Sequence, residues 1–377
     1  RYPYPKGQQH LRDCLGKLNI SLHISNHLAQ LDRQAAKPVK TSDFDYDLPP
    51  ELIAQHPIEP RDASRLMVID RQDGTIQHTV FRNIGEYLRC GDVLVLNETR
   101  VIPARVAVRK VPSGGRGELL LLRPANGSAW EALVGGKGLK KGRLLQVENG
   151  PNAEIIAELG GARRLVHFDQ PVEQFLPGTG QVPLPPYIHM PLADPERYQT
   201  VFARRPGSAA APTAGLHFTP ELIASLQDQG IRFAYLTLHV GLDTFAPVTE
   251  TDPRHHPMHT EWCSLDEHAA ALIGQARQDG GRVIAVGTTS VRTLETAYRF
   301  GEGGGVSPYE GPTDLFILPG YQFHMVDSMV TNFHLPRSTL IMMVSAFAGR
   351  ELILWAYELA KQEGYRFYSF GDAMLIF

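Results

Sequence analysis

The stretch that decides the fold is RVIAVGTTSVR, residues 282–292. Its apolar run predicts a buried strand over Arg282–Val286, and a helix over Ser290–Phe300 follows after a short turn of glycine and hydroxyl residues. In an α/β sheet, ligands bind at the turns that follow the carboxyl ends of strands, and helix N-termini attract carboxylates. We therefore predict that this turn binds a ligand through Thr288, Thr289, Ser290 and Arg292. The alternative is that one hydroxyl only caps the helix.

Outside residues 101–169, predicted strands alternate with predicted helices, the pattern of an α/β sheet. The further expected strands are Arg65–Asp70, Asp92–Leu96, Phe233–His239, Asp314–Leu318 and Met329–Phe333. The further expected helices are Phe81–Leu88, a helix from a capping box at Ser264 to about Gln278, Ser338–Ala348 and Leu352–Glu363.

Within residues 101–169, short strands are separated by glycine-rich turns, and this pattern predicts a small antiparallel barrel. The six expected strands are Val101–Lys110, Glu118–Ala125, Ala129–Val134, Leu144–Glu148, Ala153–Leu159 and Arg163–Phe168. The predicted fold is an α/β sandwich domain interrupted by an inserted six-stranded antiparallel β-barrel. We expect the α/β domain at 41–98 and 171–377, the barrel at 99–170, and a rigid proline linker at Pro183–Pro186. Residues 1–40 have neither a sustained apolar period nor a signal-peptide pattern, and we expect a disordered or extraneous extension.

The charges are unevenly distributed. The whole chain has a formal net charge of −3, yet residues 98–143 carry ten basic and three acidic side chains, a net charge of +7. Such a block predicts binding of a polyanion, and the alternative is a solvated barrel face. Three unpaired cysteines and the lack of any long apolar run predict a cytoplasmic protein without a membrane span, a disulfide framework or a cysteine-based zinc site.

A second ligand-binding loop is predicted at AAAPTAGLHF, residues 209–218, which precedes a helix with Thr219 as N-cap and Pro220 as first residue. Small residues allow a ligand to approach the backbone, so we expect Thr213, Ala214 and Gly215 to bind it, with His217 at the edge. The alternative is a tight loop without chemistry.

Further polar motifs follow in HHPMHTE, residues 255–261, at His239 near a strand end, in TNFHLP, residues 331–336, and at Asp372. A histidine beside a carboxylate, as at His259 and Glu261, is suited to acid–base catalysis; a histidine-rich surface loop is the alternative. Pro257 disfavours the helix that would place His255 and His259 on one face, so no metal is expected. Asn332 and His334 are suited to recognition of an unpaired base, and Asp372 to ribose hydroxyls.

These motifs resemble those of the S-adenosylmethionine:tRNA ribosyltransferase-isomerase family from about Ser42 to the C-terminus. The matching segments are Ser42–Phe44, Asn97–Arg105, Pro183–Ile188, Ala210–Phe218, Thr237–Gly241, Met258–Glu261, Gly287–Arg292, Val330–Pro336 and Phe370–Met374. Asp243 stands where the family often has glycine. The resemblance implies an α/β sandwich with an inserted barrel. It also implies transfer and isomerisation of the ribosyl moiety of S-adenosylmethionine onto 7-aminomethyl-7-deazaguanine at the tRNA wobble position, giving epoxyqueuosine-tRNA, adenine and methionine.

This resemblance gives the candidate residues their expected roles. We expect His259 and Glu261 as bases, His217 and His239 as acids, and Phe218, Phe245 or Trp262 beside the sulfonium. The cosubstrate is expected at Thr213, Ala214, Gly215, Thr288, Thr289, Ser290, Arg292 and Asp372, and tRNA at Asn97, Arg100, Arg105, Lys140, Lys141, Asn332 and His334. A monomer that binds the anticodon loop is expected. Two alternatives are a metal-dependent hydrolase using His255, His259 and Cys263, and a non-catalytic RNA-binding protein.

Overall fold

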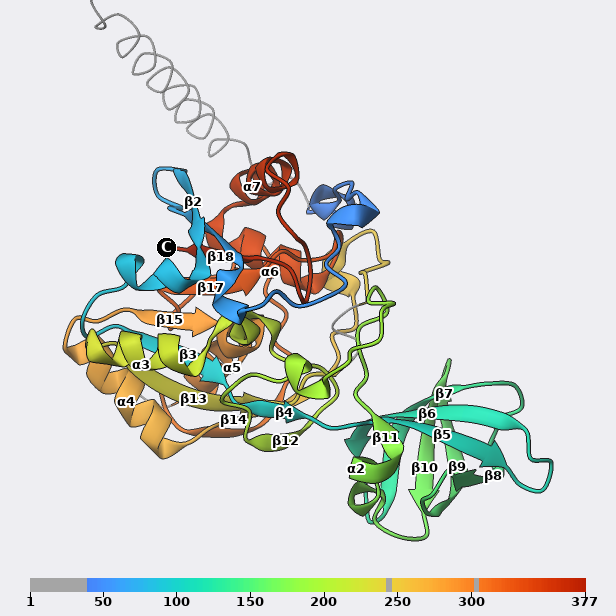
Figure 1. Ribbon diagram of the computed structural model, residues 1–377. Helices are drawn as coiled ribbons and strands as arrows, with labels where there is room; N and C mark the ends of the chain where they lie inside the picture. Colours follow the sequence, from blue (N-terminus) through green and yellow to red (C-terminus); the bar gives the residue numbers. More distant parts are fainter. Residues whose placement is uncertain (1–38, 242–245, 302–304) are drawn as a thin grey trace, which may run out of the picture.

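A nine-stranded mixed sheet forms the centre of the α/β part in the computed structural model, which describes residues 39–241, 246–301 and 305–377 (Figure 1). The strands β13, β3, β15 and β17 are parallel to one another, while β18 and β1 run opposite to them and parallel to each other. Their order is β16 (Tyr309–Thr313), β14 (Glu261–Leu265), β13 (Arg232–Leu238), β3 (Val93–Asn97), β15 (Val283–Val286), β17 (Ser328–Asn332), β18 (Ala373–Ile376), β1 (Arg65–Ile69) and β2 (Ile76–Val80).

Helices cover both faces of this sheet because its central strands are apolar on both sides. The larger core lies under α4 (Glu267–Gln278), α5 (Thr288–Phe300), α6 (Thr339–Ala348) and α7 (Arg350–Gln362). The other face packs against α3 (Pro220–Asp228) and the 3-10 turns η4 (Phe81–Tyr87) and η7 (Thr213–His217). The remaining 3-10 turns are η1 (Thr41–Phe44), η2 (Pro50–Leu52), η3 (Arg61–Ala63), η5 (Val172–Gln174), η6 (Pro195–Tyr198) and η9 (Pro253–His255).

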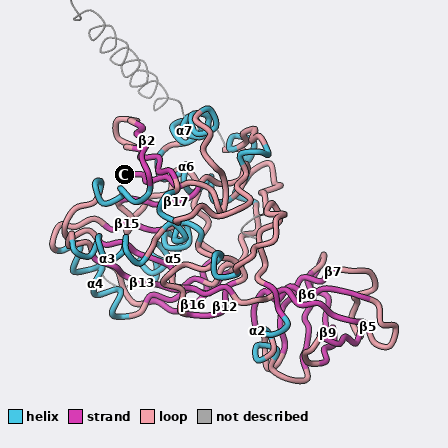
Figure 2. Tube along the Cα trace, in the orientation of Figure 1, coloured by secondary structure: helices cyan, strands magenta, loops and turns pink. Residues whose placement is uncertain are grey.

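The predicted barrel is present and stands apart from the sheet (Figures 1 and 2). All its neighbours are antiparallel, and pairing of β5 with β8 closes it around its own apolar core. Its strands are β5 (Arg105–Lys110), β6 (Arg116–Pro124), β7 (Ala129–Gly135), β8 (Leu144–Val147), β9 (Asn152–Gly160) and β10 (Arg163–Phe168), with β11 (Gly180–Gln181) added beside β5 and the short helix α2 (Leu176–Thr179) nearby. The α/β fold with an inserted six-stranded barrel is therefore confirmed.

The segment between the sheet and the barrel differs from the prediction. Instead of one strand over Val101–Lys110, β4 (Thr99–Val101) pairs in parallel with β12 (Arg205–Ser208), and the chain then breaks before β5. Pro103 lies in the break, and proline lacks the N–H that a continuous ladder needs. The two short strands occupy the neck between the sandwich and the barrel (Figure 1).

Three other local predictions are wrong. Residues 314–318 form no strand; the preceding residues Tyr309–Thr313 form edge strand β16 instead. Ser264 lies within β14, and Asp266 caps α4 by accepting from Ala269 N at 2.8 Å. The helix over Phe81–Leu88 is the 3-10 turn η4. By contrast, Thr219 caps α3 and Pro220 begins it, as predicted.

Residues 1–38 of the predicted extension lie outside the described residues, as does Asp243. Val39 packs partly buried against the larger core, and Lys40 N donates to the Asp43 carboxylate at 2.8 Å. Within the described part of the chain, no single helix is long and apolar enough to cross a bilayer. Helices α6 and α7 pass that test only as a pair, bent by 113°.

Candidate functional site

The candidate site lies at one edge of the sheet, where the ends of several strands meet. The parallel strands β13, β15 and β17 end there, and the oppositely directed β18 and β1 begin there. Chain segments that are far apart in the sequence are thereby brought together, as expected for the carboxyl edge of a parallel sheet.

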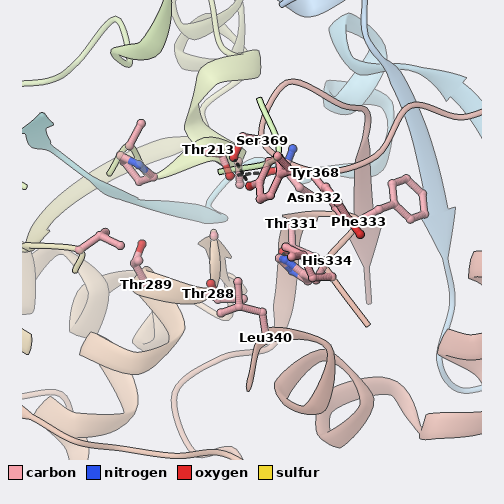
Figure 3. A pocket seen from close by; sticks show the side chains of 17 residues that line it. Thr213, Thr288, Thr289, Thr331, Asn332, Phe333, His334, Leu340, Tyr368 and Ser369 are labelled. Atoms are coloured by element: carbon pink, nitrogen blue, oxygen red, sulfur yellow. Dashed lines mark hydrogen bonds between the residues drawn. The ribbon is translucent and has the colours of Figure 1, made fainter. Parts of the chain in front are cut away.

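A pocket opens at this edge, with about 530 Å³ of empty volume that includes space open to solvent (Figure 3). Of the predicted ligand-binding residues, Thr213, Ala214, Thr288 and Thr289 line it; Asn332 and His334, which we predicted to bind RNA, also line it. The other lining residues are Tyr187, Ala211, Pro212, Val240, Gly287, Thr331, Phe333, Leu335, Leu340, Tyr368 and Ser369.

The hydroxyls at the start of α5 differ in what they contact. Ser290 Oγ donates to Val286 O at 2.9 Å, so this hydroxyl is used inside the turn. Thr289 Oγ1 is buried, and within the described residues it has no hydrogen-bond partner. Gly287, with φ +89, turns the chain from β15 into α5 and is in the region that favours glycine. A buried hydroxyl without a partner at a pocket wall is available to a ligand.

Asn332 at the end of β17 connects the two predicted loops. Its Oδ1 accepts from Thr213 Oγ1 at 2.9 Å, and its Nδ2 lies 3.2 Å from His217 Nε2. His217 Nε2 therefore accepts, and its Nδ1 donates to Ser64 Oγ at 2.7 Å. Burial, with Arg366 and Arg61 nearby, lowers the pKa of His217 to about 3. This imidazole is neutral at physiological pH, and it fixes the orientation of the Asn332 amide.

His334 and Asp372 bond mainly to the protein. His334 Nε2 pairs with Thr331 Oγ1 at 2.7 Å, and burial lowers its pKa to about 3. The Asp372 carboxylate accepts from the backbone N–H groups of Arg65 and Arg366 at 2.9 and 2.8 Å, and burial raises its pKa. Asp372 and Gly215 do not line the pocket. The Asp372 carboxylate links the start of β1, at Arg65, to Arg366 in the segment before β18.

A buried charged cluster lies beside the pocket. Glu261 on β14 pairs with Arg292 on α5, accepts from Gly241 N at 2.8 Å, and lies 3.3 Å from His259 Nε2. Burial alone would raise the pKa of Glu261, but Arg292, His259 and Gly241 together lower it to about 2. Because the folded-state pKa is below the usual 4.5, this carboxylate stabilises the fold above that pH, and its contribution is lost as the pH falls toward 2.

His239 lies outside the pocket although its neighbour Val240 lines it. Its Nδ1 bonds Thr99 Oγ1 at 2.8 Å. Burial, and to a smaller extent the nearby charge of Arg205, lowers the pKa of His239.

His255, His259 and Cys263, the three residues of the hydrolase alternative, do not form a metal site. In the described ranges no three His, Cys, Asp or Glu side chains are placed to hold a metal ion. Burial raises the pKa of the Cys263 thiol to about 12.

The residues predicted to bind RNA are distributed over three places. Asn332 and His334 lie in the pocket, whereas Asn97 is buried and bridges strands, with its amide bonded to both backbone groups of Leu238. Arg100 pairs with Glu196 at 2.5 Å and Arg105 with Glu118 at 2.6 Å. Lys140 and Lys141 are exposed on the loop between β7 and β8.

Sequence reasoning missed the aromatic wall of the pocket. Tyr187 and Tyr368 pack with ring centroids 4.7 Å apart, and Tyr187 OH bonds Ser369 Oγ at 2.7 Å. Tyr187 directly follows the predicted linker Pro183–Pro186 and lies in the matching segment Pro183–Ile188, which was the available signal for this wall. Phe218, expected beside a cation, is fully buried against Phe81, and Phe245 lies outside the described residues.

Comparisons with known proteins agree along nearly the whole described chain. A family described as queuosine biosynthesis protein matches residues 41–376. Proteins named S-adenosylmethionine:tRNA ribosyltransferase-isomerase from Symbiobacterium thermophilum and Caldanaerobacter subterraneus subsp. tengcongensis are each 54% identical over 342 residues, covering 90% of this chain and 100% of theirs. The crystal structure of S-adenosylmethionine tRNA ribosyltransferase from Thermotoga maritima is 40% identical, with a TM-score of 0.53, covering 89% of this chain and 100% of that one.

We predict that Thr289→Val leaves the stability of the ligand-free protein unchanged or raises it, because the buried hydroxyl that it removes has no partner. The matched control is Thr296→Val on the same helix, since Thr296 Oγ1 bonds Thr313 Oγ1 at 2.7 Å in the core. The control is expected to cost about 1–3 kcal/mol in the free energy of unfolding. Urea denaturation measures both; an equal loss for the two variants would contradict the prediction.

Proposed function

Because this chain belongs to the queuosine biosynthesis protein family, we propose that it acts on tRNA with S-adenosylmethionine as cosubstrate. The proposed reaction transfers and isomerises the ribosyl moiety onto 7-aminomethyl-7-deazaguanine at the wobble position, with adenine and methionine as the other products. A base removes a C5′ proton that the sulfonium acidifies, adenine leaves, the aminomethyl nitrogen bonds to the sugar, and epoxide closure releases methionine.

The observation that carries the cosubstrate assignment is the pocket at the carboxyl edge of the sheet. Its hydroxyl wall, Thr213, Thr288 and Thr289, is suited to ribose or carboxylate groups, and Thr289 has an unused buried hydroxyl. On another wall lie Tyr187 and Tyr368, whose rings are suited to a sulfonium cation. Small residues, Ala211, Ala214 and Gly287, leave room for the ligand to approach the backbone.

We assign the base to the His259–Glu261 pair. Arg292 keeps Glu261 ionised, and an ionised carboxylate 3.3 Å from His259 Nε2 holds the imidazole in a fixed orientation. The cluster adjoins the pocket through Gly241, which follows the lining residue Val240, and through Arg292, one turn after Thr289 on α5. His217 has a positioning role through Asn332 and Thr213, since its Nε2 and Nδ1 are both bonded within the protein.

We assign the first contact with tRNA to the barrel. Several of its cations are paired, as in Arg105–Glu118, Arg109–Glu148 and Arg123–Glu131. Lys140 and Lys141 form no ion pair within the described residues, and both are exposed. Unneutralised lysines on an exposed loop favour contacts with phosphates, while base identity is read elsewhere.

The reaction is tested by mass analysis of tRNA nucleosides after incubation of tRNA carrying the aminomethyl-deazaguanine with S-adenosylmethionine. We expect epoxyqueuosine in the tRNA, with adenine and methionine released in equal amounts. Methylated nucleoside with S-adenosylhomocysteine as co-product would overturn the proposal.

We predict that Glu261→Gln slows turnover by roughly 10²-fold or more, as expected for loss of an acid–base pair. Since this change also leaves Arg292 buried without its partner, His259→Asn serves as a second variant that keeps the Glu261–Arg292 ion pair. The matched control is Glu250→Gln, because Glu250 pairs with His256 at 2.8 Å away from the pocket. Full turnover by a folded His259→Asn variant would place the base elsewhere.

We predict that changing Lys140 and Lys141 to alanine weakens tRNA binding and lowers the salt slope by roughly 0.7–0.9 per lost phosphate contact. Affinity for S-adenosylmethionine should be unchanged, because the pocket lies in the sandwich. A charge-matched control is Arg89→Ala with Arg299→Ala, two exposed cations of the sandwich. Equal effects of the two double variants on tRNA affinity would contradict a specific role for the barrel lysines.

A further inference from the structure

A partly exposed tryptophan, Trp262, directly follows Glu261 of the charged cluster on β14. Trp262 on β14 stacks on His239, with ring centroids 5.3 Å apart and an interplanar angle of 17°. Trp262 remains 36% exposed, although tryptophan is usually well buried. With one side of its ring system stacked on the imidazole, the exposed part of the indole is able to pack against a further ring.

The His239 ring, on which Trp262 stacks, also contacts two neighbouring strands. His239 Nδ1 bonds Thr99 Oγ1 on β4, and the backbone of Gly207 on β12 lies against the imidazole. A Cβ at Gly207 would meet the imidazole at 2.7 Å, and the φ of +146 there also favours glycine. The stack of His239 and Trp262 is thus a fixed platform built by β4, β12, β13 and β14.

The edge of this platform is positively charged. Arg204 and Arg205 share one buried carboxylate, Glu98, at 3.8 and 3.2 Å. Their side chains are nevertheless 66% and 48% exposed. Two guanidinium groups on one carboxylate leave a net positive charge at the surface, where a phosphate is able to reach it.

The platform is connected along the chain to both places already assigned. His239 directly precedes Val240, which lines the pocket, and Thr99 is in β4, which leads through the neck to barrel strand β5 (Figure 1). We therefore expect an RNA that contacts both the barrel and the pocket to pass close to this surface.

We propose that Trp262, backed by His239, is a stacking platform for an unpaired base of the tRNA substrate other than the modified one, with Arg204 and Arg205 on the adjoining phosphates. The assignment rests on the proposed action on tRNA. Aromatic rings flanked by cations are the usual means of binding single-stranded RNA, because every base has a face that stacks. The platform thereby positions the loop, while the pocket receives the base that reacts.

The first experiment reports contact directly. In a protein carrying Trp130→Phe and Trp355→Phe, Trp262 is the only tryptophan left of the three in the chain. Titration with an anticodon stem-loop RNA is expected to quench its fluorescence with the same midpoint as binding. A titration in which binding occurs without any change of emission would overturn the platform.

The second experiment separates stacking from charge. Trp262→Ala is expected to raise the KM for tRNA about tenfold, leave the KM for S-adenosylmethionine unchanged and leave the salt slope unchanged, whereas Trp262→Phe restores most of the loss. Trp355→Ala is the matched control, since Trp355 is 50% exposed on α7. A tRNA KM within twofold of wild type for Trp262→Ala would overturn the platform while product formation still supported the proposed function. Absence of product with the wild-type protein would overturn the proposed function itself.

Discussion

The common direction of β13, β3, β15 and β17 is the constraint on which the rest of the structure depends. Parallel strands place all their carboxyl ends at one edge, so the segments that follow them must meet there. Strands β18 and β1 run the other way and contribute their beginnings to the same edge. The pocket, the charged cluster and the aromatic platform are three consequences of this single arrangement.

Buried polar groups then fix the conformation of that edge. The Asn97 amide joins β3 to β13, the Asp372 carboxylate holds two backbone N–H groups, and Asn332 holds Thr213 and His217. Each such group is costly to bury without partners and orients its neighbours when the partners are present. Thr289 differs from these groups, because within the described residues its buried hydroxyl at the pocket wall has no hydrogen-bond partner.

In the proposed function, the barrel and the sandwich divide the task of binding a large and a small substrate. Exposed lysines on the barrel act over a long range and depend on salt, whereas the enclosed pocket depends on shape and on a few hydrogen bonds. The neck of β4 and β12 connects them, and Trp262 lies beside it. Pairing of β5 with β8 closes the barrel around its own core, separate from the sheet.

The sequence by itself determined the alternation of strands and helices, the barrel strands, the cap at Thr219 and the basic block, because each depends on near neighbours in the chain. It also indicated two ligand-binding loops, at Thr213 and at Thr289, and both residues line the pocket. Only the tertiary structure decided that His217 is buried and neutral, that Asn332 lies in the pocket, and which residues stand beside each other across the sheet. Those facts follow from the pairing of strands that lie far apart in the sequence, and no local pattern contains that pairing.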